Sequence, residues 1–407
     1  MFFDSLSLLI SKAAFIGLRL LTLFSLAFVL PKEVFGAISL AFTTAEICRF
    51  IADWGVDTWS LRQFSHPDLV LARTRFVQMI QMRLAASVLA FLIAWTAIGM
   101  VAPSFGRGAG TLIALLASTS LWLNISVNWL QARRRLGKAS LSLFLAGTAC
   151  GFVLLYMHFV RAPYVHSLAA LIIFEVSIVM VLFRLAFKTE QVAPLAHRMR
   201  VFAVLKETTP IAVAVLFALA YGRLDIYFVS GHFDHKALAD YSFANRLVEP
   251  VLFGAAALSS TLYARASNIL QRDAADRAGF SVYAIGKIKL VAKGAALLCV
   301  LLAIVMPVLV RTFLPDYSSA TVLIWIALLC TFFRCTNLAF TAIIQASGGY
   351  RTMMLISVFN GFSIITLIFV GGLAFGPGGT IAGVTLGESV NSLIQFMKVR
   401  SLTRELS

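Results

Sequence analysis

Residues 84–102 have the sequence LAASVLAFLIAWTAIGMVA, an apolar run in which no residue is charged. The run is long enough to cross a bilayer, because a transmembrane helix needs roughly 20 consecutive apolar residues. Peptide groups in the hydrocarbon core have no water to bind, so a spanning segment is either a helix or a strand of a closed barrel. A continuous run of this length predicts a helix.

Similar runs recur along the whole chain. Of its 407 residues, 60% are hydrophobic and only 13% are charged, with a mean hydropathy of +0.90. These values lie outside the usual range of soluble domains, which could not bury so much apolar surface. We therefore expect an all-α polytopic membrane protein with about 12 transmembrane helices. The predicted spans are 6–30, 36–58, 79–102, 110–130, 139–159, 166–184, 208–230, 241–263, 290–311, 319–342, 353–374 and 379–397.

The net charge of +16 does not indicate a nucleic-acid partner, because of where the basic residues lie. Most of the Lys and Arg outside the spans fall in alternate loops, and short cytoplasmic loops gather such residues. With the N-terminus and the C-terminus both cytoplasmic, the basic loops all lie inside. Anionic membrane lipids are then their natural partners. The five cysteines and six histidines show no metal-ligand spacing, so the sequence predicts no metal and no cofactor.

The two halves of the chain resemble each other. Arg19-Leu20 in the first half corresponds to Arg223-Leu224 in the second, and Lys32 corresponds to Lys236. Six helices per half give both repeats the same orientation, so a pseudo-two-fold axis along the membrane normal is expected to relate them. We predict an N-terminal six-helix lobe at 1–200 and a C-terminal six-helix lobe at 201–407. Two lobes in one chain make a monomer sufficient.

Several short motifs, spread in order over essentially the whole chain, resemble those of the polysaccharide-repeat flippases. Asp53, Gly55 and Arg62 match the Asp-x-Gly pattern that ends the second helix in that family. The other matching stretches are Arg223-Leu224-Asp225, Ala239-Asp240-Tyr241-Ser242, Ala244-Asn245-Arg246-Leu247-Val248-Glu249, Leu314-Pro315-Asp316-Tyr317 and Gly376-Pro377-Gly378-Gly379. One departure is Ala382, which stands where many relatives repeat a glycine.

The resemblance implies the multidrug/oligosaccharidyl-lipid/polysaccharide exporter superfamily, whose members have two six-helix lobes. It implies that the chain is a transporter of the bacterial inner membrane, not an enzyme. Its substrate would be an undecaprenyl-diphosphate-linked oligosaccharide repeat unit, moved by alternating access for O-antigen, capsule or exopolysaccharide synthesis. A polysaccharide polymerase and glycosyltransferases would be its partners in the pathway.

Arginines within predicted spans are the most informative residues, because a charge at a helix centre costs at least about 2.5 kcal/mol without a partner or a wet cavity. Guanidinium groups offer forked donors to phosphate and carboxylate. We therefore predict that an interlobe cavity binds the anionic substrate through these arginines. The alternative is that Arg49 and Arg246 pair with Glu46, Asp53 and Glu249 as structural locks. The candidate substrate-binding residues are Arg19, Arg49, Arg223, Arg246 and Arg334.

Acidic residues in the spans are candidates for coupling to a proton or sodium ion, with structural salt bridging as the alternative. The candidates are Glu46, Asp53, Asp57, Asp225, Glu249 and Glu388. In the second span, Glu46, Arg49, Asp53 and Asp57 are spaced three, four and four residues apart, so they are expected to lie on one stripe of its helix. A second polar stripe, Ser118, Ser120, Asn124 and Asn128, is expected to form hydrogen bonds between helices, with lining of the cavity as the alternative. Gly376 to Gly379 indicate a tight turn.

Two other functions remain open at the level of the sequence. A cation-coupled multidrug exporter of the same superfamily would bind organic cations, which several arginines in the membrane would repel. A membrane-embedded glycan transferase or ligase acting on the same lipid carrier usually needs a large soluble loop or paired catalytic carboxylates, and the predicted outside loops are short.

Overall fold

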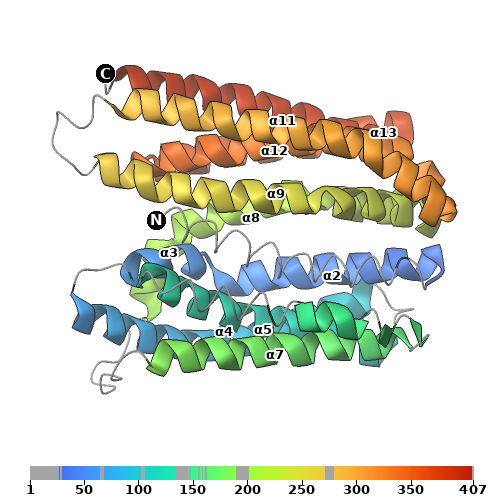
Figure 1. The fold of residues 1–407 in the computed structure, drawn as a ribbon, viewed down its shortest axis with the longest axis horizontal. Helices are drawn as coiled ribbons and strands as arrows, with labels where there is room; N and C mark the ends of the chain where they lie inside the picture. The colour runs from blue at the N-terminus through green and yellow to red at the C-terminus, as the bar shows by residue number, and fades with distance from the viewer. Residues whose placement is uncertain are drawn as a thin grey trace. The chain divides into compact units, whose positions relative to one another are not determined.

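The structure, a computed structural model, describes residues 30–64, 68–101, 106–133, 163–188, 201–270 and 279–405, together with residues 27, 145, 148–154, 156, 157, 159 and 160. All regular secondary structure in these ranges is helical (Figure 1). The predicted all-α polytopic membrane fold is therefore confirmed. The chain divides into two compact units, Met1–Leu216 and Phe217–Ser407.

The first unit is built around α5 (Arg107–Ala132). Among the described helices, it packs against four others of the same unit. They are α2 (Lys32–Asp53), α3 (Val56–Phe64), α4 (Leu69–Val101) and α7 (Tyr164–Lys188). The division between the units falls within α8 (Val201–His232), a long helix that contains Pro210.

The second unit is built around α12 (Thr321–Ala346), which packs against three long helices. These are α9 (His235–Leu270), α11 (Phe280–Phe313) and α13 (Tyr350–Glu405). A short 3₁₀ helix, η1 (Pro315–Ala320), joins α11 to α12. These two central helices bury polar side chains among their neighbours, although α12 also exposes Val322, Trp325 and Leu329.

The described helices account for most of the predicted spans. Eight of them are long and apolar enough to cross a membrane, and the two halves of α8, bent by 44°, make a ninth. One of the eight, α13, covers both predicted spans 353–374 and 379–397. The predicted span 6–30 lies almost entirely outside the described residues, and the predicted span 139–159 lies partly outside them.

Two helices begin earlier than predicted because an aspartate caps each one. The predicted span 79–102 belongs to a helix that begins at Leu69, where the Val70 amide donates to Asp68 Oδ1 at 2.8 Å. The predicted span 241–263 belongs to a helix that begins at His235, where the Ala237 amide donates to Asp234 Oδ1 at 2.8 Å. Such caps satisfy amide groups of the first turn, so both helices extend beyond their apolar runs.

The predicted glycine turn is present within α13. Gly376 has φ 69° and ψ −155°, a conformation essentially restricted to glycine, and it separates the two helical halves. Gly379, Gly383 and Gly387 then recur every four residues on one face of the second half. A methyl group on any of them would collide with Gly371, Leu367 or Ile364 of the first half. The two halves therefore pack at backbone distance.

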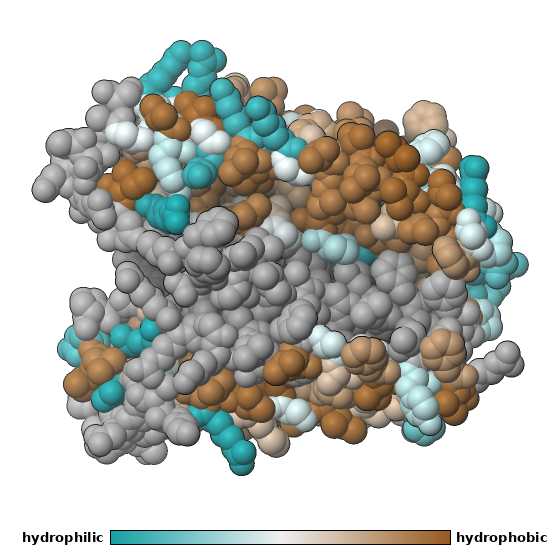
Figure 2. Space-filling view, viewed as in Figure 1, coloured by the Kyte–Doolittle hydropathy of each residue, from teal (hydrophilic) through white to brown (hydrophobic). Residues whose placement is uncertain are grey.

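The outer helices turn apolar side chains outward. On α11, Leu297, Ile304 and Val308 are 75%, 67% and 63% exposed, and their spacing places them on one face. Figure 2 shows apolar side chains gathered over the middle of the visible face of the second unit, with hydrophilic ones at its ends. Water would not stabilise such a face, whereas lipid would. All five cysteines are free and buried.

Candidate functional site

The second predicted span is not one helix, which corrects the expected stripe of charges. Its helix α2 ends at Asp53, and the next two residues adopt left-handed conformations, with φ 49° at Trp54 and 73° at Gly55. A Cβ at Gly55 would lie 2.9 Å from the Ala212 amide nitrogen, so this position also requires glycine for space. Asp57 consequently belongs to α3, in a different orientation from Glu46 and Arg49 on α2.

Arg83 of α4 binds the carboxylates on both sides of this break. Its Nη1 lies 2.6 Å from Asp53 Oδ1, and its Nη2 pairs with Asp57 Oδ1. The Arg83 side chain is only 1% exposed. Because Asp53 ends α2 and Asp57 lies in the first turn of α3, this one guanidinium group fixes the angle between the two helices. Sequence reasoning missed Arg83, since its partners lie on other helices.

Two asparagines of α5 complete the cluster. Asn124 Nδ2 donates to Asp57 Oδ2 at 2.6 Å, and Asn128 Nδ2 donates to the Asp57 carbonyl at 2.9 Å and to Ser60 Oγ at 3.0 Å. On the same helix, Ser120 Oγ donates to the buried Glu175 Oε2 at 3.3 Å. The predicted interhelical hydrogen bonding of the α5 stripe is confirmed for these three residues.

The other candidates in the first half of the chain are Arg49, Glu46 and Arg19. Arg49 is partly buried on α2, with its guanidinium carbon 4.1 Å from the centre of the Phe50 ring, and its charge acts on Asp57. Asp53, which was one of its expected partners, pairs with Arg83 instead. Glu46 is half-buried on the same helix. Arg19 lies outside the described residues.

In the second unit, Arg223 and Arg246 meet at one carboxylate. Arg223 Nη1 of α8 lies 3.0 Å from Glu249 Oε1, and Arg246 Nη1 lies 2.8 Å from the same oxygen and 3.2 Å from Glu249 Oε2. The Glu249 side chain is 11% exposed. Arg246 thus pairs with Glu249, as the alternative of a structural lock has it, and Arg223 contacts the same carboxylate from another helix.

Asp225 lies two residues after Arg223 and is buried. It accepts a hydrogen bond of 2.6 Å from the Tyr241 hydroxyl of α9 and one of 2.8 Å from the Ile226 amide. The charges of Arg334 and Arg223 both act on this carboxylate. Asp225 therefore interacts electrostatically with one arginine of α8 and one arginine of α12.

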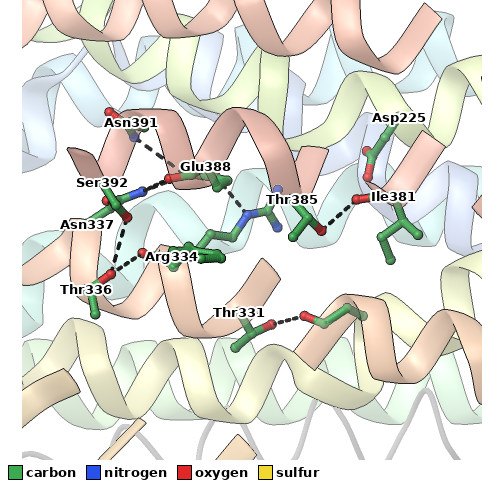
Figure 3. A network of polar contacts seen from close by, with 12 residues as sticks. Asp225, Thr331, Arg334, Thr336, Asn337, Ile381, Thr385, Glu388, Asn391 and Ser392 are labelled. Atoms are coloured by element: carbon green, nitrogen blue, oxygen red, sulfur yellow. Dashed lines mark hydrogen bonds and ion pairs between the residues drawn. The ribbon is translucent and has the colours of Figure 1, made fainter. Parts of the chain in front are cut away.

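Arg334 pairs with a carboxylate of α13. Its Nε donates to Glu388 Oε1 at 3.1 Å, and Asn337 Nδ2 donates to Glu388 Oε2 at 2.8 Å. Asn391 adds a weaker contact to the same oxygen at 3.4 Å. Figure 3 shows Arg334 between Glu388 and Asp225. Glu388 has no basic residue at helical spacing, so only the packing of α13 on α12 reveals its partner.

Five charged residues of the second unit thus form two ion-paired groups, Arg246–Glu249–Arg223 and Arg334–Glu388, and the charges of Arg223 and Arg334 both act on Asp225. We call these six residues the charge chain: Arg246, Glu249, Arg223, Asp225, Arg334 and Glu388. Four helices contribute to it. Charges buried in this way are stable only when each has a partner, and removal of one partner typically costs about 3–5 kcal/mol.

The sequence matches no protein-family model and no curated protein, but the fold is similar to solved structures. A multidrug resistance MATE family transporter of the MOP superfamily, in an inward-facing conformation, aligns with a TM-score of 0.73 at 14% identity, covering 97% of this chain and 95% of that one. The lipid II flippase MurJ, in an inward closed conformation, aligns with a TM-score of 0.73 at 13% identity, over 98% of this chain and 88% of that one.

A third similar structure is a MOP superfamily transporter from Pyrococcus furiosus, described as having a binding pocket of reversed polarity. It aligns with a TM-score of 0.73 at 13% identity, over 99% of this chain and 95% of that one. At such low identity the likeness concerns the fold and carries no substrate with it. This chain is a multi-pass membrane protein with the fold of the MOP superfamily transporters.

Proposed function

We propose that the protein translocates undecaprenyl-diphosphate-linked oligosaccharide repeat units across the inner membrane by alternating access. The superfamily fold supports a transporter, and one of the similar structures is the lipid II flippase MurJ. The motifs shared with polysaccharide-repeat flippases support this substrate class.

One observation carries the proposal for an anionic headgroup. Arg223 and Arg246 reach one carboxylate, Glu249, from two helices, so two guanidinium groups converge on one point. A diphosphate offers several acceptor oxygens and matches such convergent donors, because guanidinium binds phosphate through forked hydrogen bonds. In the proposed cycle Glu249 binds the two arginines while no headgroup is present.

The first experiment is deletion of the gene in its source bacterium. We expect lipid-linked glycan to accumulate on the cytoplasmic side of the membrane and surface polysaccharide to be lost. Normal surface polysaccharide in the deletion strain would contradict the proposal.

The deletion strain then allows the arginines to be tested. Arg223→Ala and Arg246→Ala are expected to reduce export at least tenfold at equal membrane abundance, measured as surface polysaccharide per molecule of transporter. The matched control is Arg311→Ala, at an exposed arginine in the last turn of α11, which should export normally. Normal export by both test variants would remove the charge chain from the proposed mechanism.

A cation-coupled multidrug exporter is the second candidate. One feature of the first unit favours it. Asp53 and Asp57 both pair with Arg83, so two carboxylates lie beside one guanidinium group. Solved MATE structures also share the fold. Increased sensitivity of the deletion strain to cationic drugs, with normal polysaccharide, would establish this candidate in place of the flippase.

A further inference from the structure

We propose that Asn337 and Ser392 are positioning residues, which keep the terminal nitrogens of Arg334 available to an oxyanion of the substrate. The oxyanion is either the carboxylate of an acidic sugar or a phosphate group. The inference rests on the proposed function, because it adds a second anion-binding point to the one formed by Arg223 and Arg246.

The ion pair of Arg334 with Glu388 uses one edge of the guanidinium group. Within the described part of the chain, the only hydrogen bond of Arg334 runs from Nε to Glu388 Oε1, at 3.1 Å, and Nη2 is buried without a partner. A guanidinium group can bind a carboxylate through two parallel hydrogen bonds, so this pair is incomplete. The Arg334 side chain is 21% exposed and that of Glu388 only 5%. The arginine is therefore the more accessible partner and retains donors for a second oxyanion.

Amide groups on two helices hold the second oxygen of Glu388. Asn337 Nδ2 of α12 donates to Glu388 Oε2 at 2.8 Å and to the Glu388 carbonyl at 3.2 Å. Asn391 Nδ2 of α13 lies 3.4 Å from the same Oε2. This is the oxygen that a two-bonded pair with Arg334 would need. The amides thus keep Glu388 in the arrangement with a single hydrogen bond.

Ser392 fixes the orientation of the Asn337 amide. Its hydroxyl donates to Asn337 Oδ1 at 2.6 Å, as Figure 3 shows. Because the amide oxygen accepts from Ser392, the NH₂ group is the end of the amide that faces Glu388. Ser392 Oγ also contacts Thr336 Oγ1 at 3.4 Å. A series of hydrogen bonds between α12 and α13 therefore ends at the carboxylate that pairs with Arg334.

Asp225 is the other carboxylate whose charge acts on Arg334. The described residues include no ion pair between the two, and Asp225 Oδ2 instead accepts from the Tyr241 hydroxyl at 2.6 Å. Its charge opposes an oxyanion at Arg334, because like charges repel in a medium of low dielectric constant. Asp225→Asn keeps an acceptor for Tyr241 and should therefore strengthen oxyanion binding.

Removal of the Asn337 amide should let Glu388 turn Oε2 toward Arg334 and occupy its terminal nitrogens. We expect Asn337→Leu, which has a similar size, to weaken oxyanion binding about tenfold, the usual effect of one lost charge-assisted hydrogen bond. Asn337→Leu/Glu388→Gln removes the competing carboxylate and should restore binding. A merely structural role of Asn337 predicts no restoration, because the double variant loses a further buried interaction.

The test measures binding of two probes to the purified full-length protein in dodecyl maltoside, at constant pH and salt. Octyl β-D-glucuronide carries a sugar carboxylate, with octyl β-D-glucoside as its neutral counterpart, and farnesyl diphosphate carries the phosphates. Weaker binding of the glucuronide by Asn337→Leu would assign the acidic sugar to Arg334, and weaker binding of farnesyl diphosphate would assign a phosphate.

The matched control is Thr341→Val, which removes another hydrogen bond between α12 and α13, from Thr341 Oγ1 to Gln395 Oε1 at 3.0 Å. This variant should bind both probes like wild type. If Asn337→Leu does not fold, Ser392→Ala removes only the hydroxyl that orients the amide and provides the same comparison.

Several results would overturn the inference. They are equal binding of both probes by wild type and Asn337→Leu, no restoration by Glu388→Gln, and weaker binding by Asp225→Asn. Each of them leaves the flippase proposal intact, because loss of surface polysaccharide in the deletion strain tests that proposal separately. Normal surface polysaccharide together with the expected binding pattern would instead refute the flippase and retain the anion site.

Discussion

Arg83 shows how a single buried side chain can fix the geometry of a helix break. It pairs with Asp53 before the break and with Asp57 after it, while Trp54 and Gly55 between them adopt left-handed conformations. Trp54 is not a glycine, so its conformation costs about 1 kcal/mol or more and must be stabilised from outside the turn. The Trp54 indole nitrogen donates to Thr209 Oγ1 at 3.4 Å, which contributes to this stabilisation.

Arg83→Gln is therefore expected to destabilise the protein severely. The substitution leaves two buried carboxylates without their cation, and loss of one partner of a buried ion pair costs about 3–5 kcal/mol. We expect a marked fall in membrane abundance and in the thermal midpoint of the detergent-solubilised protein. Arg107→Gln, at an exposed arginine at the start of α5, serves as the control and should behave as wild type.

A triple variant separates the charge effect from a packing effect. Asp53→Asn/Asp57→Asn/Arg83→Gln removes all three charges together and should recover part of the lost stability. If the triple variant is no more stable than Arg83→Gln, uncompensated charge does not explain the loss.

Residue patterns along a single helix could not predict ion pairs between side chains on different helices. The hydrogen bonds of Asn124 and Asn128 were predictable, because a polar stripe on an apolar helix must find partners. Arg83 has no carboxylate three or four residues away in its own helix, and Glu388 has no basic residue at that distance. The break after Asp53 did have a signal in the Asp-Trp-Gly sequence, since glycine after a polar residue often ends a helix.

At the scale of the elements, the close packing of the two halves of α13 depends on glycines. Gly379 approaches the backbone of Gly371, and Gly383 approaches the backbone of Leu367. Without a strong hydrophobic drive between helices in lipid, such close approach supplies the packing that holds helices together. The turn at Gly376 brings the two halves side by side. The glycine content of this region predicted the turn, but only the packing shows why the later glycines recur every four residues.

Two adjacent glycines give a sharp test of this packing. Gly379→Ala forces the halves of α13 apart and should destabilise the protein by about 1–3 kcal/mol. Gly378→Ala meets no atom within 4 Å and should be neutral or slightly stabilising, because alanine favours helix over glycine. Thermal midpoints of the two variants in the same detergent provide the comparison. Equal destabilisation by the two variants would show that Gly379 does not lie in close contact with the backbone of Gly371.

At the scale of the whole molecule, the distribution of burial matches a protein surrounded by lipid. The central helices α5 and α12 carry buried polar side chains, whereas α11 exposes Leu297, Ile304 and Val308. The fold class was predictable because each apolar run must become a helix in the bilayer. Helix ends were less predictable, since caps such as Asp68 and Asp234 extend helices beyond the membrane-spanning run.

Charges introduced on α11 should reveal where the hydrocarbon begins. Ile304→Lys places a cation on an exposed apolar face, which costs about 2.5–3.5 kcal/mol near the bilayer centre, and should lower membrane abundance. Thr312→Lys, beside Arg311 in the last turn, should be tolerated. Abundance in isolated membranes measures both. Similar abundance of the two variants would mean that the face around Ile304 does not contact lipid.

The burial of every native thiol makes the wild-type sequence a suitable background for site-specific labelling. Buried, uncharged thiols react slowly with maleimides and methanethiosulfonates, since the thiolate is the nucleophile. A cysteine introduced at an exposed position such as Leu297 should therefore be modified first, without prior replacement of Cys48, Cys150, Cys299, Cys330 or Cys335. Fluorophores or spin labels attached in this way would follow the transport cycle in a protein whose own packing has not been altered.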